Sequence, residues 1–384
     1  MKILILSDDF PPLSFGGAGI STFDLSRGFS RAGHQVFVIT TCQKKNEERD
    51  FEYEGLKIFR IFTNFHERWE PYLSLYNPKT VGKVAKIIKE INPDVVHAQN
   101  IHSFLSYHCL KIAKNSGKPV FLTARDTMLF TYGKLATKRY LKKLDPRISW
   151  LDNLKQAKKR YNPFRNIIIR HYLKYVDKIF AISNSLKQAL EANGIKNVEV
   201  VYNGIDVDEW QMGSKIAGGF EDKKIVFFAG RISNLKGAEL INQAMDLVKK
   251  DVPEAVLLVA GTRGVGWLDG DNLKAAYHAA DIVVVPSVYL DPFNRTNIEA
   301  MACKKPVVGT CFGGTPEIVK DGVTGYIVNP LNIELMAQKI TDLLKNPEKA
   351  QQFGELGYER VKKYFNLNEC VAKNIYEYET IQKH

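Results

Sequence analysis

Two carboxylates flanking the start of a helix form the most chemically suggestive stretch of this sequence. Asp291 and Glu299 are separated by seven residues, and a helix predicted over 296–302 begins between them. Carboxylates accept hydrogen bonds from vicinal hydroxyls, and free N–H groups at a helix start suit a phosphate. The pair therefore fits a polyhydroxylated, phosphorylated ligand. A turn-forming aspartate and a solvated helical glutamate explain the same two residues equally well.

Two cations in a glycine-bounded loop suit a doubly charged ligand. The loop 230–237 follows a short apolar stretch, 225–229, that is typical of a buried strand, and it carries Arg231 and Lys236. Arginine binds phosphate as a fork and lysine as a point charge, so the two can neutralise a diphosphate. Ordinary surface cations are the alternative, and the position at a strand end favours binding.

Two further glycine turns precede predicted helices. Gly313-Gly314-Thr315-Pro316-Glu317 follows a strand, and its proline suits a first helical turn. Gly16-Gly17-Ala18-Gly19 lies before the first helix of the chain. Simple turn chemistry explains each of these as well as ligand binding does, because a lone glycine loop is a weak signal.

Alternating apolar strands and amphipathic helices must position these loops, and they predict an α/β fold of parallel sheets. In the first half the expected strands are 1–7, 34–40, 55–62, 94–97, 119–123, 178–182 and 198–201, with helices 20–32, 77–91, 101–116 and 183–193. In the second half the strands are 225–229, 255–260, 282–286, 306–310 and 325–328, with helices 238–250, 273–280, 296–302, 315–319, 332–345 and 347–364. Asn203-Gly204 reads as a hinge between two such units, so a cleft is expected between two domains.

Composition narrows the class of protein. The chain has 384 residues and five scattered cysteines, with neither a Cys-x-x-Cys pair nor a histidine at ligand spacing. This argues against a disulfide framework and a zinc site. The first apolar run is too short for a secretory signal, and none approaches the length of a membrane span. We expect a cytoplasmic protein without a metal.

The net charge of +12 is concentrated in one segment. Residues 133–178 hold 14 Lys or Arg and three Asp, a balance of 14 − 3 = +11, mixed with apolar and aromatic side chains. As a basic amphipathic stretch it could rest on the anionic inner face of a membrane, where it would reach a lipid-linked acceptor. It could also bind an acidic polysaccharide or a nucleic acid, or form a solvated helical hairpin.

Taken together, these motifs resemble the retaining glycosyltransferases of family 4, which have the GT-B fold. The similarity rests on the ordered set Gly16-Gly17, Arg231 to Gly237, Asp291-Pro292-Phe293 to Ala302, and Gly313 to Glu317, with Asn203-Gly204-Ile205-Asp206 similar to the interdomain segment. The resemblance implies two Rossmann-like domains whose parallel sheets face across a cleft. It implies an N-terminal acceptor domain, 1–202, and a C-terminal donor domain, 203–365, with helix 366–384 packing back on the first.

The resemblance also implies roles for individual residues. Arg231 and Lys236 would bind the donor diphosphate and stabilise it as it leaves, so no metal or other cofactor is expected. Asp291 would contact the donor sugar and Glu299 the nucleotide ribose. The remaining donor-binding residues would be Gly16, Gly17, Phe293, Asn294 and Gly314.

The sequence departs from the family pattern at several positions. Asp291 stands where the family usually has Glu, and Asn294 where Gly is common. Arg125-Asp126 stands where many relatives have His-Asp; arginine cannot act as a general base, although it can hold a phosphate or an acceptor carboxylate. We include Arg125 and Asp126 among the catalytic candidates. Segments 212–219 and 261–267 are shorter than in relatives.

The favoured function is transfer of a sugar from a nucleotide-diphosphate donor to a saccharide or lipid-linked acceptor, in surface polysaccharide or glycolipid synthesis. Two alternatives stay open. One is a sugar-nucleotide epimerase on the same fold, and the other is a non-catalytic basic protein that binds nucleic acid or an anionic polymer. Nucleic acid is not expected as a partner of the favoured function.

Overall fold

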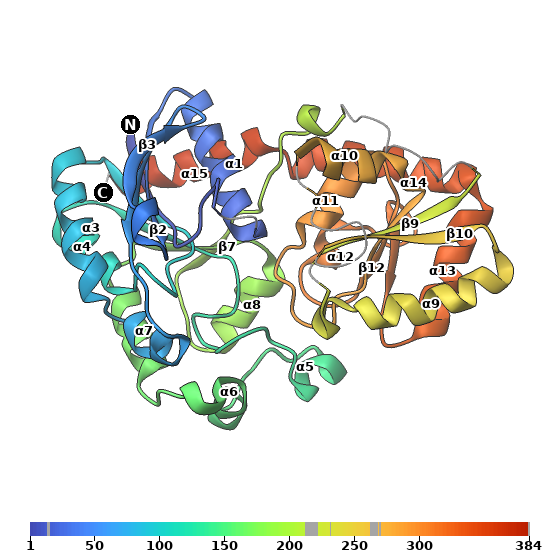
Figure 1. The fold of residues 1–384 in the computed structure, drawn as a ribbon, viewed down its shortest axis with the longest axis horizontal. Helices are drawn as coiled ribbons and strands as arrows, with labels where there is room; N and C mark the ends of the chain where they lie inside the picture. The colour runs from blue at the N-terminus through green and yellow to red at the C-terminus, as the bar shows by residue number, and fades with distance from the viewer. Residues whose placement is uncertain (14–15, 212–221, 231, 262–267, 269, 383–384) are drawn as a thin grey trace. The chain divides into compact units, whose positions relative to one another are not determined.

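The computed structural model describes residues 1–13, 16–211, 222–230, 232–261, 268 and 270–382 (Figure 1). The chain divides into two compact units. The first comprises Met1–Lys134, Pro146–Gly204 and Leu367–His384, and the second comprises Leu135–Asp145 and Ile205–Asn366. Each unit has its own sheet and its own core.

An eight-stranded sheet forms the centre of the first unit, with strand order β3-β4-β2-β1-β5-β6-β7-β8. All neighbouring strands are parallel except β3 and β4, which are antiparallel. The strands are β1 (Lys2–Leu6), β2 (Gln35–Cys42), β3 (Arg49–Tyr53), β4 (Leu56–Phe62), β5 (Val95–Ala98), β6 (Val120–Ala124), β7 (Lys178–Ala181) and β8 (Val198–Val200). Short apolar strands of this kind are typical of a sheet covered on both faces.

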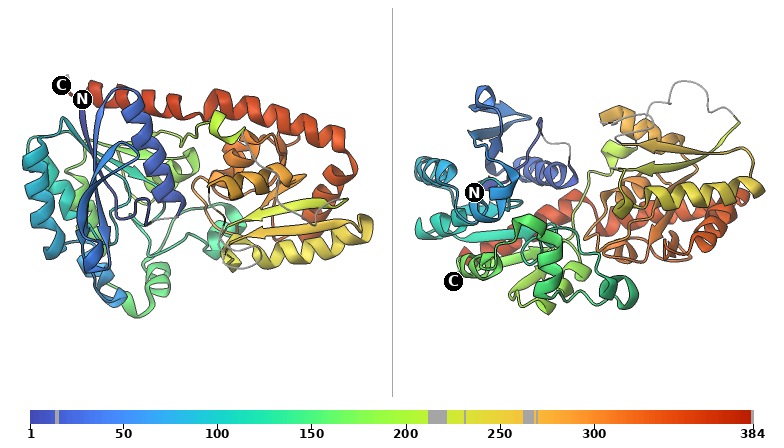
Figure 2. Two further views of the ribbon diagram at one scale, coloured as in Figure 1. Left: turned by 45° about the horizontal axis from the view of Figure 1, so that its top comes forward. Right: turned by 60° about the horizontal axis from the view of Figure 1, so that its bottom comes forward.

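Helices cover this sheet. They are α1 (Gly17–Arg31), α2 (Glu70–Leu73), α3 (Pro78–Ile91), α4 (His108–Asn115), α6 (Trp150–Ala157), α7 (Arg165–Leu173), α8 (Asn184–Ala192) and α15 (Leu367–Gln382). Single 3₁₀ turns lie at Lys45–Glu47, Glu67–Trp69 and Lys158–Arg160. The C-terminal α15 lies beside α1 (Figure 2), and a Cβ at Gly28 of α1 would come within 2.5 Å of Val371 Cγ2. The last helix is thus an integral part of the first unit.

The second unit has a five-stranded parallel sheet with order β10-β9-β11-β12-β13. Its strands are β9 (Lys224–Ala229), β10 (Ala255–Ala260), β11 (Ile282–Val285), β12 (Val307–Thr310) and β13 (Gly325–Val328). Its helices are α5 (Lys138–Lys143), α9 (Ala238–Asp251), α10 (Gly270–Ala279), α11 (Arg295–Ala302), α12 (Thr315–Ile318), α13 (Ile333–Lys345) and α14 (Pro347–Tyr364), with 3₁₀ turns at Asp208–Trp210 and Asn234–Lys236.

Alternate residues of strand β9 face opposite sides of this sheet. Val226 and Phe228 belong to a core shared with α9 and α13. Phe227 packs instead on Tyr277 of α10, with the ring centroids 5.0 Å apart. The predicted parallel α/β class is therefore confirmed in both units.

One predicted helix begins later than expected. The pattern of 101–116 predicts a helix throughout, whereas α4 covers only His108–Asn115. The backbone N–H groups of 103–105 instead donate to the Asp8 carboxylate over 2.6–3.0 Å, and Ser106 has a positive φ of 79°. A buried carboxylate distant in the sequence thus competes successfully with helix formation.

The basic segment 133–178 also differs from expectation. Residues 135–145 with α5 belong to the second unit, while α6 and α7 belong to the first, so the alternative of a single helical hairpin does not hold. The predicted domain boundary assigned the whole segment to the first domain. Leu135 and Tyr140 are both buried and make their contacts in the second unit, which is the physical reason for the difference.

Candidate active site

The point where strand order reverses defines a site in the second unit. Strand β9 lies between β10 and β11, so successive connections leave β9 in opposite directions. In open α/β sheets, ligands bind at the carboxyl ends of the strands at such a switch point. The loop after β9 carries Lys236, and the loop after β11 carries Asp291. The fold therefore brings together two residues that are 55 positions apart.

A cation–carboxylate pair occupies this switch point. Lys236 Nζ lies 2.7 Å from Asp291 Oδ2, and Asp291 is only 5% exposed. Ser287 Oγ and Asn294 Nδ2 also donate to Oδ2, at 3.2 and 3.0 Å. The backbone N–H of Val288 donates to Leu235 O at 2.8 Å and ties the two loops together. Arg231, the second predicted cation, lies outside the described residues.

Two glycines hold these loops at distances that no other residue allows. Gly237 has φ +77°, and a Cβ there would lie 2.1 Å from Pro286 O. Gly313 has φ +68°, and a Cβ there would lie 2.1 Å from Asp291 O. The next residue, Gly314, donates its N–H to Asp291 O at 2.8 Å. Gly314 and Asp291, which were both predicted to bind the donor, thus lie against each other.

Helix α11 positions the remaining donor-side candidates. Asn294 is its N-cap and accepts from Thr296 N at 3.1 Å, so its amide joins the helix start to Asp291. Phe293 is buried and packs edge-on against Phe365, with the ring centroids 5.7 Å apart.

Glu299 is 8% exposed and is not the solvated helical residue of the alternative explanation. Tyr277 donates to its Oε2 at 2.8 Å and Arg295 Nε to its Oε1 at 3.0 Å. Burial, with the Glu299 charge beside it, raises the pKa of Tyr277 well above its usual value, so Tyr277 stays a donor. Sequence reasoning missed Tyr277 because no local motif marks it.

A segment inserted in the sequence of the first unit contributes to this site. We call residues 135–145 the strap; it leaves the first unit after Lys134 and returns at Pro146. Leu290 N donates to Leu135 O, and Gly313 N donates to Tyr140 Oη, both at 2.8 Å. The strap therefore holds Leu290, which precedes Asp291 in the chain, and Gly313, which packs against the Asp291 backbone. Only the tertiary structure reveals this role.

Removing the Tyr140 hydroxyl should weaken this support. The Tyr140→Phe protein is expected to lose about 1–3 kcal/mol of stability, since the Gly313 N–H loses its buried acceptor, and to bind the ligand of this site more weakly. Tyr326→Phe is the matched control, because it removes a hydroxyl bonded to Asp342 elsewhere in the same unit. Chemical denaturation and ligand affinity are the measurements, and equal ligand affinity in both variants would contradict the role of the strap.

In the first unit, the predicted Gly16-Gly17 lies at the start of α1. Gly16 is the N-cap, with φ −79° and ψ 145°, and its carbonyl accepts from Ile20 N at 3.1 Å. Neither residue has a positive φ, so glycine is not required by backbone conformation. Gly17 is exposed, which leaves its backbone open to close approach by a ligand.

Arg125 and Asp126 follow β6 and make different contacts. Arg125 donates through Nε and Nη2 to Gln99 Oε1, at 3.1 and 2.8 Å, and through Nη1 to Asn203 Oδ1 at 2.8 Å. Asp126 accepts from Met128 N at 2.8 Å, and its other oxygen lies 3.6 Å from His102 Nε2. A histidine from the loop after β5, His102, thus lies near Asp126.

His97 is buried in a polar network that ends at Arg125. Its Nδ1 lies 2.5 Å from the Tyr378 hydroxyl of α15, and its Nε2 lies 2.8 Å from Thr123 Oγ1 and 3.0 Å from Gln99 Nε2. Because Gln99 uses its oxygen for Arg125, its amide must donate, and the network assigns the Nδ1–H tautomer. Burial, and secondarily Arg125, lowers the pKa of His97 to about 3, so His97 is neutral.

This pKa gives the stability a defined pH dependence. In the unfolded chain His97 becomes protonated below about pH 6.5, whereas in the folded protein it becomes protonated only near pH 3. The stability contributed by neutral His97 is therefore fully present above about pH 6.5, and it is lost progressively as the pH falls toward 3. Between pH 6.5 and 5 we expect a loss of about 2 kcal/mol that His97→Gln abolishes. Urea unfolding at the two pH values tests this, with His171→Gln, at an exposed position, as the control. An equal change in the free energy of unfolding between the two pH values in wild type, His97→Gln and His171→Gln would refute it.

Solved structures of known proteins share this two-unit fold. Sucrose-phosphate synthase from Thermosynechococcus elongatus superposes with a TM-score of 0.77 at 20% identity, covering 100% of this chain and 99% of that one. HepE from Anabaena, solved in complex with UDP-glucose, gives a TM-score of 0.70 at 18% identity, covering 98% and 100%. The fold class is that of the GT-B glycosyltransferases, as predicted.

Sequence comparison places the chain within that class. The model of Glycosyltransferase Family 4 matches residues 15–209, and the model of Glycosyl transferases group 1 matches residues 214–360. The chain therefore belongs to glycosyltransferase family 4 and is an enzyme. An uncharacterized glycosyltransferase of Methanocaldococcus jannaschii is 26% identical, with 90% of each chain covered. Glycogen synthase of Mycobacterium tuberculosis is 24% identical, with 95% of this chain and 91% of that protein covered.

Proposed function

We propose that this enzyme is a retaining glycosyltransferase that moves a sugar from a nucleotide-diphosphate donor to a saccharide or lipid-linked acceptor, in the synthesis of a surface polysaccharide or glycolipid. The observation that carries the proposal is the Lys236–Asp291 pair at the switch point of the second unit, 2.7 Å apart. A lysine and a nearly buried carboxylate in contact present both groups that a sugar diphosphate needs: a cation for phosphate and an acceptor for sugar hydroxyls.

The chemistry follows from where charge develops. Cleavage of the bond between sugar and diphosphate gives the sugar oxocarbenium character and the leaving phosphate negative charge. Lys236 is held before the reaction by Asp291 and by the Val288–Leu235 hydrogen bond, so it can stabilise that charge with little reorganisation. Attack by the acceptor on the leaving-group face gives retention. NMR of the product should show the anomeric configuration of the donor, and an inverted product would overturn this part of the proposal.

The proposed reaction uses protein cations in place of a divalent ion. Transfer rates should be unchanged by EDTA, because the Lys236 ammonium beside Asp291 supplies positive charge for the leaving phosphate. Loss of activity in EDTA that returns with Mg²⁺ or Mn²⁺ would overturn this part of the proposal.

Nucleotide binding is the first experiment. The protein is melted with excess UDP, GDP and ADP and with their sugar conjugates, beside an Arg231→Ala, Lys236→Ala double variant. Ligand at a hundred times its Kd adds about 2.7 kcal/mol, which should raise Tm by roughly a few degrees. HepE is solved with UDP-glucose, so uridine nucleotides are tried first. If no nucleotide raises Tm, the proposed donor site is wrong, and the alternative of a non-catalytic binding protein gains support.

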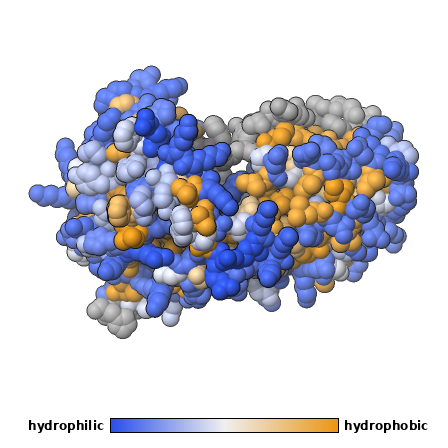
Figure 3. Space-filling model, turned by 90° about the horizontal axis from the view of Figure 1, so that it is seen from below, coloured by the Kyte–Doolittle hydropathy of each residue, from blue (hydrophilic) through white to orange (hydrophobic). Residues whose placement is uncertain are grey.

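We further propose that α6 and α7 approach an anionic membrane carrying the acceptor. Large apolar side chains on and beside them are exposed, among them Trp150 (65%), Phe164 (65%) and Ile167 (64%). The exposed cations of this region are Arg147, Lys155, Lys158, Lys159, Arg170 and Lys174. Figure 3 shows apolar side chains interspersed among hydrophilic ones on one face. No described helix is long and apolar enough to cross a bilayer.

Vesicle flotation tests this surface. Binding to phosphatidylglycerol vesicles but not to phosphatidylcholine vesicles is expected, because apolar insertion and cation attraction must act together. Phe164→Ser, Ile167→Ser should abolish flotation, while Leu331→Ser, Leu356→Ser, which also changes exposed leucines, should not. Equal flotation of both variants would contradict the assignment of the surface.

A further inference from the structure

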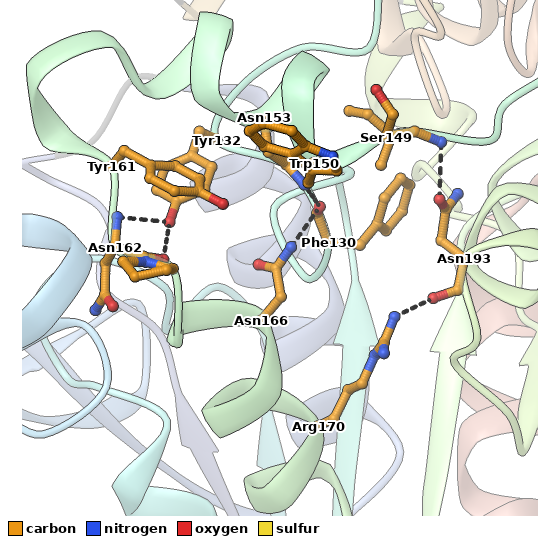
Figure 4. Close-up of a pocket in the computed structure, with 12 residues that line it drawn as sticks. Phe130, Tyr132, Ser149, Trp150, Asn153, Tyr161, Asn162, Asn166, Arg170 and Asn193 are labelled. Carbon is orange, nitrogen blue, oxygen red and sulfur yellow. Dashed lines mark hydrogen bonds between the residues drawn. The ribbon is translucent and has the colours of Figure 1, made fainter.

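A cavity in the first unit has the size of a single sugar ring. It lies between α6, α7 and the chain segments at the two ends of the strap, and its volume is about 200 Å³ (Figure 4). This equals roughly six or seven water molecules in the liquid. A space of this size is enough for one pyranose ring.

We propose that this cavity binds one anionic sugar unit, a pyranose bearing a carboxylate or a phosphate, as part of the acceptor. The proposal rests on the proposed transferase function and adds the chemical class of the acceptor. Three features support it: the aromatic walls, a buried acceptor atom that no donor reaches in the part of the chain that the structure describes, and an arginine in a lining that includes no acidic residue.

Aromatic side chains form one side of the cavity. Tyr132 and Tyr161 lie together there, with ring centroids 5.8 Å apart, and Phe130 and the exposed Trp150 add two more rings (Figure 4). Tyr132 is fixed, because its hydroxyl donates to Asn162 O at 2.6 Å and accepts from Asn162 N at 3.1 Å. Rigid rings present flat apolar faces with little loss of conformational entropy, and such faces match the C–H face of a sugar.

A second part of the cavity lining is polar, and it includes the side-chain amide of Asn153. Asn153 is buried, and its Nδ2 donates to Phe130 O at 3.2 Å, which fixes the orientation of the amide. Within the part of the chain that the structure describes, no donor reaches Asn153 Oδ1. Leaving a buried acceptor unpaired costs about 1–3 kcal/mol. A ligand hydroxyl that reaches this wall would recover that energy.

The opposite side of the cavity is positively charged. Arg170 donates from Nη2 to Asn193 O at 2.8 Å, which orients the guanidinium at the cavity edge, beside Asn193 in Figure 4. A guanidinium has five N–H groups in a planar fork, which pairs with a carboxylate or phosphate. None of the residues that line the cavity is acidic. The charged substituent of the sugar would therefore point toward Arg170, with its ring against Tyr132 and Tyr161.

The position of the cavity gives it a connection to the donor loops. Tyr132 lies just before the strap, and Ile148 to Trp150 lie just after it, while the strap itself bonds Leu290 and Gly313. A sugar bound between the two ends of the strap would restrain both of them. The anionic sugar could be the end of a soluble polysaccharide or the head group of a glycolipid.

Binding of small glycosides to the intact protein tests the site. Saturation-transfer NMR and calorimetry would compare methyl glucuronide, glucose 6-phosphate and the neutral methyl glucoside. We expect both anionic sugars to bind at least ten times more tightly than the neutral one, and Arg170→Gln to remove that difference. Lys174→Gln, which removes a nearby exposed charge, should change affinity less than two-fold, and Trp150→Ala should weaken all three sugars. Vesicles containing a glucuronosyl diacylglycerol distinguish the glycolipid source from the soluble one.

The outcomes separate this site from the donor site. Equal affinity for charged and neutral glycosides, or equal effects of Arg170→Gln and Lys174→Gln, overturns the proposal. The Tm increase with nucleotide should be the same in Arg170→Gln as in the wild-type protein. Nucleotide binding without glucuronide binding rejects the cavity alone, whereas glucuronide binding without any nucleotide effect rejects the transferase proposal and leaves the sugar site standing.

Discussion

Replacement of Lys236 by alanine is expected to lower kcat/KM for glycosyl transfer by about 10²–10³-fold, the usual effect of removing one preorganised group that stabilises developing charge. The ammonium lies at the switch point between β9 and β11, fixed 2.7 Å from Asp291. If it acts on the leaving phosphate, kcat should fall as much as kcat/KM, because that interaction is stronger in the transition state than in the bound substrate.

The control for this variant is Lys249→Ala, which removes an exposed ammonium from α9. Both proteins lose one positive charge, so a general electrostatic effect on the donor would appear equally in both. Release of nucleoside diphosphate, followed with a coupled assay, gives the rates. A decrease of less than five-fold for Lys236→Ala would remove Lys236 from the catalytic machinery.

Gly313→Ala should disrupt the donor site while the same change at Gly322 should not. Both glycines have nearly the same positive φ, 68° and 69°, but a Cβ at Gly322 meets nothing within 4 Å, whereas at Gly313 it meets Asp291 backbone atoms at 2.1–2.7 Å. The φ cost is common to both, about 1–2 kcal/mol. Overpacking adds about 1–3 kcal/mol at Gly313. The expected loss of stability is therefore about 2–5 kcal/mol for Gly313→Ala, against about 1–2 kcal/mol for Gly322→Ala.

Two measurements separate strain from displacement of the Asp291 loop. Denaturant unfolding gives the stability difference between the two variants, and a nucleotide titration gives the effect on the site. Nucleotide affinity should fall at least ten-fold in Gly313→Ala and stay within two-fold in Gly322→Ala. Equal stability losses in the two variants would show that the loop relaxes around the added methyl group.

Sequence patterns predicted most of the regular structure because parallel sheets need short, fully apolar strands. Strands β1, β9 and β11 are predicted within two residues at each end. The sequence also places Lys236 and Asp291 on loops that follow strands, whereas their contact depends on β9 and β11 being neighbours in the sheet. The partners of Glu299 were not predictable, because Tyr277 comes from α10 and its contact depends on packing rather than on any local motif.

Non-local interactions explain the parts that sequence analysis missed. The late start of α4 depends on Asp8, which is nearly a hundred residues earlier in the chain. The strap carries the same basic and aromatic residue types as α6 and α7, so its composition does not reveal that Leu135 and Tyr140 are buried in another unit. The contacts of Arg125 with Gln99 and Asn203 depend likewise on strand order in the folded sheet.

The strap has a practical consequence for separating or exchanging the two units. The chain passes between them at four places, after residues 134, 145, 204 and 366. A second unit expressed as 205–366 alone would lack Leu135 and Tyr140 and expose the Leu290 and Gly313 amides that they cover. Chimeras that combine the second unit of one relative with the first unit of another should therefore take residues 135–145 from the same relative as the second unit.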